Sequence, residues 1–268
     1  MTDVRSHFGF HSMPFTCEVP IEKRFETELF SEAVEALART VDKRMSAALI
    51  GPAGTGKTVV LRTLKDRLPE ARYQLRYIKV ADLSKRDMCR EIASVVGAAP
   101  AGNYPALVRK LQERFLACMN HDSQRPVTVI DESHDMRPEV IGMLRLLTNF
   151  EMDSKLVLSV ILCGQPPLRR LLQRDALTDV ARRLALCVSL RPLSREESSR
   201  YIEHRINIAG AKVIPFDPGS LEALYEIARG NMRATDVLAL KSLELACDAG
   251  LKAVGSNHVA EARRLVIP

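Results

Sequence analysis

The stretch LIGPAGTGKTVVL, residues 49–61, constrains the fold of this chain more than any other part of its sequence. Gly51, Gly56, Lys57 and Thr58 complete the pattern GxxxxGK[ST]. In this pattern successive backbone N–H groups wrap a chain of phosphates, the lysine reaches the terminal ones, and the hydroxyl group binds Mg²⁺. The pattern requires a buried strand before the loop and a helix after it, whose positive end faces the anion. The apolar run AALIG and the helical run that follows the loop meet both requirements.

We therefore predict a site for a magnesium-bound nucleoside triphosphate, with an incidental glycine turn as the alternative. Thr58 is the expected Mg²⁺ ligand of the loop, because its hydroxyl group follows the lysine. The residues expected to contact the phosphates follow the strand without interruption: Gly51, Pro52, Ala53, Gly54, Thr55, Gly56, Lys57, Thr58 and Val59.

A second segment, VTVIDES, supplies the carboxylates that such a site needs. Its apolar run ends in Asp131, and Glu132 follows directly. An aspartate at the tip of a strand can hold Mg²⁺ through water, and a glutamate beside it can orient and polarise the attacking water. We interpret Asp131 as part of the metal and nucleotide site and Glu132 as the group that activates water. Solvated carboxylates are also common at strand ends, so the pair is informative only together with the loop.

Strands and helices alternate around these two segments. The sequence predicts five strands, at AALIG, YQLRYIKV, PVTVIDES, LVLSVILCG and LCVSL, with helices between them, among them 90–96 and 104–119. Each strand is almost continuously apolar, which is typical of a parallel sheet covered by helices on both faces. After LRPLSREE the β-rich runs stop, and four helices are expected at 196–209, 220–228, 233–250 and 256–265. The predicted fold class is α/β, with a small C-terminal all-helical lid.

This pattern predicts an extended N-terminal arm over residues 1–25, an α/β nucleotide-binding domain over 26–192 and a helical lid domain over 193–268. No apolar run reaches the roughly 20 residues of a membrane span, and the N-terminus lacks the layout of a secretory signal. We therefore expect a cytoplasmic protein without a membrane partner. The net charge of +6 is compatible with a polyanionic partner. The six cysteines lack metal-ligand spacing and are expected to be reduced and mostly buried: Cys17, Cys89, Cys118, Cys163, Cys187 and Cys247.

Three arginines are candidates for contacts with the nucleotide. Arg233 stands at the start of a predicted lid helix, from which an arginine can reach the γ-phosphate. Arg182 and Arg183 lie between a helix and a strand, a position suited to reaching the nucleotide of a neighbouring subunit as an arginine finger. Which of the two would be the finger is left open, and an ordinary solvent-facing arginine is the alternative for all three.

With these positions in place, the sequence resembles the AAA+ ATPases, and within them the family of ExeA-like ATPases and the transposition regulators of the TnsC and MuB type. The resemblance covers nearly the whole chain. It rests on FGFHSMPF, FSEAVEAL, GPAGTGKT, VIDESHDM, LRLLTNFE, LCGQPPLRRLL, the arginine pair before LRPLSREES, and GNMRATDVLAL.

The resemblance implies a P-loop AAA+ fold, ATP as the nucleotide and roles for three side chains. Gln165 takes the sensor-1 position on the fourth strand, where a polar group holds water near the γ-phosphate. AAA+ proteins often carry asparagine or threonine there, and a turn residue before Pro166 is the alternative. Arg183 matches the arginine finger and Arg233 matches sensor 2.

The resemblance also implies that the loop after the second strand faces a central channel occupied by DNA. In this chain that loop is ADLSKRDMCRE, so Lys85 and Arg86 are expected to contact phosphates, with Asn103 and Tyr104 as further candidates. Such contacts would be tolerant of DNA sequence and sensitive to salt. The alternative is a solvated helix N-terminus.

The function expected from the resemblance is that of an ATP-hydrolysing transposition helper. Such a protein forms a homo-oligomeric ring or helical filament on double-stranded DNA and recruits or stimulates a transposase in DNA recombination. Secretion members of the family usually continue into a membrane span and a cell-wall-binding part, whereas the sequence in hand stops at Pro268. Two alternatives are a secretion or envelope-assembly ATPase that acts on proteins, and an ATP-binding switch without useful turnover. Glu132 argues against the second alternative.

Overall fold

The computed structural model describes residues 3–16, 18–79, 82–99, 101–120, 123–211 and 213–266. The chain forms two compact units. Unit 1 comprises residues 1–28, 53–56 and 191–268, and unit 2 comprises residues 29–52 and 57–190. The division into three domains expected from the sequence stays a prediction.

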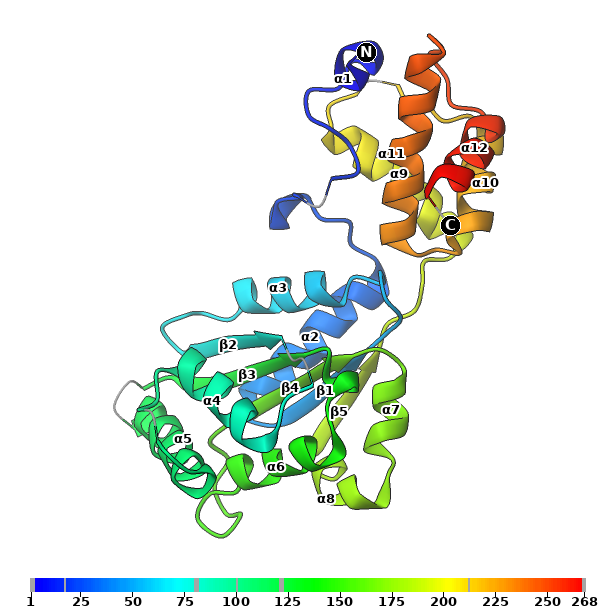
Figure 1. Cartoon of the computed structure of the whole chain (residues 1–268). Coiled ribbons are helices and arrows are strands. Elements are labelled where there is room, and N and C mark those ends of the chain that lie inside the picture. Colours follow the sequence, from blue (N-terminus) through cyan, green and yellow to red (C-terminus); the bar gives the residue numbers. More distant parts are fainter. Residues whose placement is uncertain are drawn as a thin grey trace. The chain divides into compact units, whose positions relative to one another are not determined.

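Unit 2 is built around a five-stranded parallel sheet (Figure 1). Its strands are β1 (Ser46–Ile50), β2 (Tyr73–Lys79), β3 (Arg125–Asp131), β4 (Ser159–Gly164) and β5 (Leu184–Ser189). Their spatial order is β2-β3-β4-β1-β5. The five predicted strands and their parallel arrangement are thus confirmed, except that Val80, expected at the end of β2, lies outside the described residues. Because all pairings are parallel, the carboxyl ends of the strands meet at one edge of the sheet.

Helices cover both faces of this sheet. The helices of unit 2 are α2 (Glu28–Asp42, whose first residue belongs to unit 1), α3 (Lys57–Arg67), α4 (Lys85–Val96), α5 (Tyr104–Asn120), α6 (Pro138–Thr148), α7 (Pro167–Leu172) and α8 (Thr178–Ala181), with the short 3-10 turns η2 (Ser133–Asp135) and η3 (Asp175–Leu177). Along β1, Ala47 and Leu49 join a core cluster with α2 and α3, whereas Ala48 and Ile50 join the opposite cluster with α4, α5 and α6. Burial on both faces explains why β1, β3 and β4 are nearly continuous in apolar character, whereas the edge strands β2 and β5 are partly exposed.

One helix begins earlier than the sequence indicates. Helix α4 starts at Lys85 rather than near Arg90, because Ser84 caps it by accepting a hydrogen bond from the backbone N–H of Asp87. The hydrophobic run starts only with Met88, so the first turn is recognisable by its cap and not by its apolar residues. The predicted helix Tyr104–Met119 agrees closely with α5.

Unit 1 is helical. Its main helices are α9 (Arg195–Ile208), α10 (Pro218–Ala228), α11 (Met232–Asp248) and α12 (Ser256–Val266). Each end lies within two residues of the predicted one. Helix α9 begins with a capping box formed by Ser194 and Glu197. The Arg191 guanidinium donates hydrogen bonds to Glu197, which lowers the pKa of this carboxyl group to about 2.

The N-terminal segment differs from the extended arm expected over residues 1–25. It contains α1 (Val4–Phe8) and the 3-10 turn η1 (Ile21–Lys23), and Val4, Phe10 and Phe15 are buried in the core shared by α9, α10, α11 and α12. The aromatic residues of this segment bury apolar surface against those helices, which favours an ordered segment over a free arm. Met1, Thr2 and Cys17 lie outside the described residues.

Four of the five cysteines in the described ranges are buried: Cys89, Cys118, Cys163 and Cys247. Cys187 is free and exposed. The expectation for Cys17 falls outside those ranges. Across the same ranges, no helix combines the length and the apolar character needed to cross a membrane.

Candidate nucleotide-binding site

The glycine loop begins where β1 ends. Gly51 donates its backbone N–H to the carbonyl oxygen of Gly164 at 3.1 Å, which ties the start of the loop to the end of β4. Gly54 and Gly56 have φ angles of 74° and 86°, in the left-handed region that favours glycine. Helix α3 then begins at Lys57. The loop thus has the strand–turn–helix setting that the phosphate-binding pattern requires.

Of the loop side chains expected to contact the nucleotide, Thr55 is buried and Lys57 is half-buried. The ammonium group of Lys57 donates to the carbonyl oxygens of Gly51 and Pro52, at 2.8 and 2.9 Å. Thr58 and Val59 are exposed in the first turn of α3. A bound phosphate chain would therefore replace two backbone carbonyls as the partner of the Lys57 ammonium.

The tip of the loop, Ala53–Gly56, belongs to unit 1. The side-chain amide of Asn231 donates to the carbonyl oxygen of Ala53 at 2.8 Å, and the backbone N–H of Met232 donates to that of Gly54 at 3.2 Å. A Cβ atom at Gly54 would lie 2.0 Å from Oδ1 of Asn231, so this contact requires glycine. Sequence analysis missed Asn231, although an Asn at a helix N-terminus is a recognisable capping signal.

Asp131 is held in one orientation at the end of β3. It is buried, Tyr77 donates its phenolic hydroxyl to Oδ2 at 2.7 Å, and Glu132 donates its backbone N–H to Oδ1 at 2.9 Å. Burial and the hydrogen bond to Asp131 raise the pKa of Tyr77 well above its usual value, so the phenol remains a donor. Sequence analysis missed Tyr77, because nothing in β2 alone shows which side chain reaches the neighbouring strand.

Glu132 follows with a left-handed backbone (φ 55°) and leads into η2. Few residues other than glycine, asparagine and aspartate adopt this conformation, and such strain is concentrated at functional sites. Ser133, the next residue, donates its hydroxyl to the carbonyl oxygen of Ile130 at 2.6 Å, which closes the turn. The backbone therefore bends sharply at the predicted water-activating residue.

Gln165 directly follows β4 and is half-buried. Its backbone carbonyl oxygen accepts a hydrogen bond from the backbone N–H of Leu168, at 2.9 Å, at the start of α7. Because β1, β3 and β4 are parallel neighbours in the sheet, their carboxyl ends bring the glycine loop, Asp131 with Glu132, and Gln165 to the same edge. The sensor-1 role of Gln165 stays a prediction.

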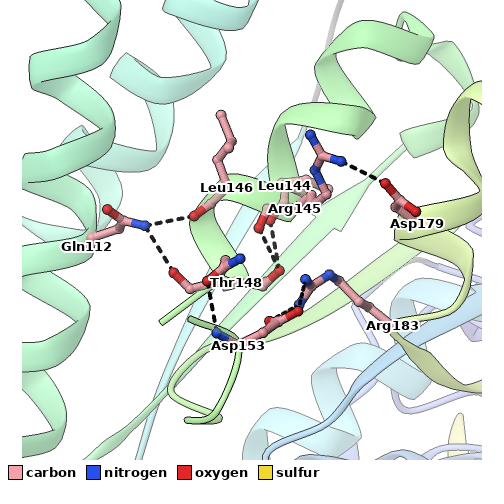
Figure 2. A network of polar contacts seen from close by, with 9 residues as sticks. Gln112, Leu144, Arg145, Leu146, Thr148, Asp153, Asp179 and Arg183 are labelled. Carbon is pink, nitrogen blue, oxygen red and sulfur yellow. Dashed lines mark hydrogen bonds and ion pairs between the residues drawn. The ribbon is translucent and has the colours of Figure 1, made fainter. Parts of the chain in front are cut away.

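Arg183 directly precedes β5 and forms an ion pair within its own subunit. Its guanidinium forms a two-pronged ion pair with Asp153, with one N–O distance of 2.6 Å (Figure 2). The hydrogen bonds from Arg183 lower the pKa of the Asp153 carboxyl group. The turn that carries Asp153 is fixed to the end of α6, because the backbone N–H of Asp153 donates to Oδ1 of Asn149 at 3.1 Å.

This ion pair lines an open cleft of about 500 Å³. A second pair, Arg145 with Asp179 at 2.7 Å (Figure 2), lines the same cleft. Its lining residues are Arg145, Leu146, Asn149, Asp153, Asp179, Arg182 and Arg183. The structure thus places both candidate finger residues at one cleft, and sequence analysis missed the aspartates that share it.

Arg233 and the DNA candidates lie near the helix starts where they were expected. Arg233 is exposed in the first turn of α11, in unit 1. In unit 2, Arg86 donates a hydrogen bond to the carbonyl oxygen of Gly102, which joins the starts of α4 and α5. Lys85 and Tyr104 line one cleft of about 510 Å³.

Asn103 has a structural use at this place: its Oδ1 accepts the backbone N–H of Ala106 at 2.9 Å, which caps α5. The contacts of these side chains with nucleotide or DNA stay predictions.

The strand order and the loop define a P-loop nucleotide-binding protein of the AAA+ class. The chain belongs to the AAA domain family, whose model matches residues 39–172. Among curated proteins, General secretion pathway protein A of Aeromonas hydrophila is 30% identical over 239 residues, which cover 88% of this chain and 43% of that protein. The chain therefore spans less than half the length of this relative.

Several solved structures share the fold. Cdc6p from Pyrobaculum aerophilum is 16% identical with a TM-score of 0.73, over 99% of this chain and 71% of that one. The ORC2 protein of Aeropyrum pernix, in its ADPNP–ADP complexes, is 16% identical with a TM-score of 0.67 (97% and 71%). The ORC1 protein of Aeropyrum pernix, in complex with DNA, is 17% identical with a TM-score of 0.66 (92% and 68%). At these identities the likeness shows the fold.

Proposed function

We propose that this protein binds and hydrolyses ATP and that the nucleotide controls its assembly on double-stranded DNA. ATP binding and hydrolysis are supported by one observation: the glycine loop, Asp131 and Glu132 lie at the same edge of the parallel sheet. Lys57 would exchange the loop carbonyls for phosphate oxygens, and Glu132 would orient and polarise the attacking water.

The residues present fit a Mg²⁺ ion. Asp131 is a fixed carboxylate and Thr58 offers an exposed hydroxyl in the first turn of α3, and both provide the oxygen ligands that Mg²⁺ prefers. When bound, the ion would neutralise charge that develops on the phosphates. We assign Thr58 and Asp131 to hold it, the second through water.

The arginine finger makes the proposed site one that two subunits share. Arg183 points its guanidinium into an open cleft of unit 2, where a carboxylate occupies the position suited to an anion. A second copy of the chain would offer its triphosphate to this guanidinium, so that ATP stabilises a ring or filament and hydrolysis releases it. Arg233 would contact the γ-phosphate from its own subunit.

Double-stranded DNA is the proposed polyanionic partner, with Lys85 and Arg86 as the first phosphate contacts. The net charge of +6 and the joined starts of α4 and α5 support this assignment. The related ORC1 fold was solved in complex with DNA. Together with the motif resemblance to the TnsC and MuB type, these features support a cytoplasmic transposition helper that recruits or stimulates a transposase.

Electron microscopy tests the assembly. The full chain is imaged with random duplex DNA and a slowly hydrolysed ATP analogue, and we expect rings or filaments. The Lys57→Ala variant serves as the matched control that cannot grip the triphosphate and is expected to remain unassembled. The absence of any assembly of the wild-type chain with DNA and analogue overturns the proposal.

A second candidate function is that of a secretion or envelope-assembly ATPase acting on proteins. The 30% identity to General secretion pathway protein A favours it. ATP turnover with and without random duplex DNA separates the two functions: stimulation that disappears in the Lys85→Ala/Arg86→Ala variant supports the DNA-bound assembly. Turnover that is indifferent to DNA supports the secretion function.

A further inference from the structure

Two buried atoms near the end of β3 face each other without a hydrogen bond. They are Oε2 of Glu132 and Nδ1 of His134, and within the described part of the chain neither has a hydrogen-bond partner. They lie 3.5 Å apart. Buried polar atoms are nearly always paired, so two orphans at this distance call for an explanation.

The turn after β3 positions the imidazole of His134 against β4. The left-handed backbone at Glu132 and the closure of η2 by Ser133 turn His134 back against β4. A Cβ atom at Gly164 would approach the backbone nitrogen of His134 to 3.2 Å and its Nδ1 to 3.4 Å, closer than most contacts of this type. The side chain of His134 is only 10% exposed in this place.

The other ring nitrogen does not explain the position of the imidazole. Nε2 lies 3.7 Å from Oδ1 of Asp135, whose side chain is 61% exposed, and this distance is too long for a hydrogen bond. A rotation that moves Nδ1 a few tenths of an ångström towards Glu132 would reach the 2.7–3.2 Å of a normal hydrogen bond. The geometry therefore indicates Glu132 as the hydrogen-bond partner of the His134 ring.

We propose that His134 is a positioning residue for Glu132: Nδ1 carries its proton and donates it in a hydrogen bond to Oε2, which leaves Oε1 to face the attacking water. This inference rests on the proposed ATP hydrolysis at this site. The alternative is that the ring only fills space against Gly164. The two differ in what they require at position 134, a hydrogen-bond donor or merely a volume.

Three variants separate donor from volume. His134→Asn keeps a donor near the place of Nδ1, His134→Phe keeps most of the volume, and His134→Ala keeps neither. Asp135→Asn is the matched control in the same turn: Asp135 contacts Glu132 through its backbone N–H, which donates to the carbonyl oxygen of Glu132 at 3.0 Å and which the substitution keeps. For each variant, kcat and KM for ATP are measured, together with the Tm and the binding of a slowly hydrolysed analogue.

We expect His134→Ala and His134→Phe to lower kcat by about 10- to 100-fold, less than the roughly 10²- to 10⁴-fold of a general base itself. KM and analogue binding should stay within about threefold, because the loop grips the phosphates independently. His134→Asn should recover most of kcat, and Asp135→Asn should match the wild type. On a Glu132→Gln background, His134→Ala should add almost nothing.

Other outcomes are equally decisive. If His134→Phe keeps full kcat, or if His134→Asn is as slow as His134→Ala while its Tm is unchanged, the donor role is overturned. Glu132→Gln distinguishes failure of the proposed hydrolytic site from failure of the positioning role of His134. Full turnover in that variant would remove the proposed hydrolytic site itself, whereas slow Glu132→Gln with fully active His134→Ala would remove only the positioning role.

Discussion

Two arginine–aspartate pairs in this molecule have the same chemistry and different surroundings. In unit 1, Arg205 and Asp236 pair at 3.3 Å with side chains 8% and 19% exposed. In unit 2, the side chains of Arg183 and Asp153 are 25% and 49% exposed at an open cleft. Another anion can replace Asp153 as a partner of Arg183, whereas no competitor can reach Arg205. The comparison teaches that burial, not pairing, distinguishes a structural ion pair from an exchangeable one.

The buried pair also fastens the N-terminal segment. Arg205 donates to the carbonyl oxygen of Thr16 at 2.6 Å, and its guanidinium lies 5.7 Å from the ring centre of Phe15. Tyr201 donates its hydroxyl to Asp236 at 2.8 Å. The side chain of one arginine thus links α9, α11 and the segment that carries α1.

The largest effect expected is on stability, from Arg205→Met. The substitution leaves Asp236 as an unpaired buried carboxylate and removes the hydrogen bond to Thr16. We expect a loss of about 3–5 kcal/mol in the free energy of unfolding, measured by urea denaturation at pH 7.

The double variant Arg205→Met/Asp236→Asn is the control, because asparagine is neutral and can still accept from Tyr201. It should recover a large part of the loss. Equal losses in the single and double variants would show that packing of the arginine, and not the unpaired charge, matters here.

The next effect concerns activity. Arg183→Ala should lower ATP turnover of the assembled protein by roughly 10³-fold, the range of arginine fingers, and change the free energy of unfolding by less than about 1 kcal/mol. Turnover is measured at protein concentrations where the wild type assembles. Arg182→Ala is the comparison that decides which arginine is the finger.

A mixing experiment tests whether this arginine acts across subunits. An equimolar mixture of Arg183→Ala and Lys57→Ala chains should regain part of the activity, because a subunit with an intact loop can meet a neighbour with an intact arginine. Activity no higher than that of the separate variants would place Arg183 outside a shared site.

The third effect is a pH dependence of the free energy of unfolding that arises from the buried pair. Burial raises the pKa of Asp236 to about 6, despite the opposing effect of Arg205. The unfolded chain has an Asp pKa near about 3.9, so between these values the folded state binds more protons. Its contribution to stability is therefore present at low pH and is lost as pH rises through about 6.

Urea denaturation between pH 4 and 7 measures this dependence. The contribution of Asp236 should decline by at most the order of 3 kcal/mol across the window, since one pKa unit corresponds to about 1.4 kcal/mol. Asp236→Asn should remove the decline, and Asp153→Asn, at the exposed pair, should leave it in place. If the free energy of unfolding of the wild type, relative to that of Asp236→Asn, rises over the same window, the assignment is contradicted.

Features that depend on neighbouring residues in the chain could be predicted from the sequence, whereas contacts between distant residues could not. The glycine loop and Asp131 could be predicted because phosphate and metal binding need particular residue types at short spacing. The strand before the loop, the helix after it and the strand before Asp131 are also recognisable from neighbouring residues. The parallel sheet followed from continuously apolar strands. These features depend on neighbours in the chain, which a single sequence displays.

The partners of the arginines could not be predicted, because they come from distant parts of the chain. Asp153 meets Arg183 across 30 residues, and Asp236 meets Arg205 across 31. Each arginine has a charged residue close by in the sequence, Arg182 or Glu203, so nothing local marks Arg205 as buried. The burial of Phe10 and Phe15 was missed for a related reason: an aperiodic segment gives no sign of the core that receives it.

The smallest effect expected tests whether the exposed pair is exchangeable. Asp153→Asn removes the charge that competes with a neighbour's phosphate for Arg183, and an exposed pair contributes little to stability. The protein concentration that gives half-maximal turnover should therefore fall by no more than about 5-fold, with little change in stability. Glu151→Gln is the control, because Glu151 lies in the same turn and pairs with Lys155 at 3.0 Å instead. A rise in that concentration would mean that Asp153 prepares Arg183 for its partner, and that the exposed pair is as structural as the buried one.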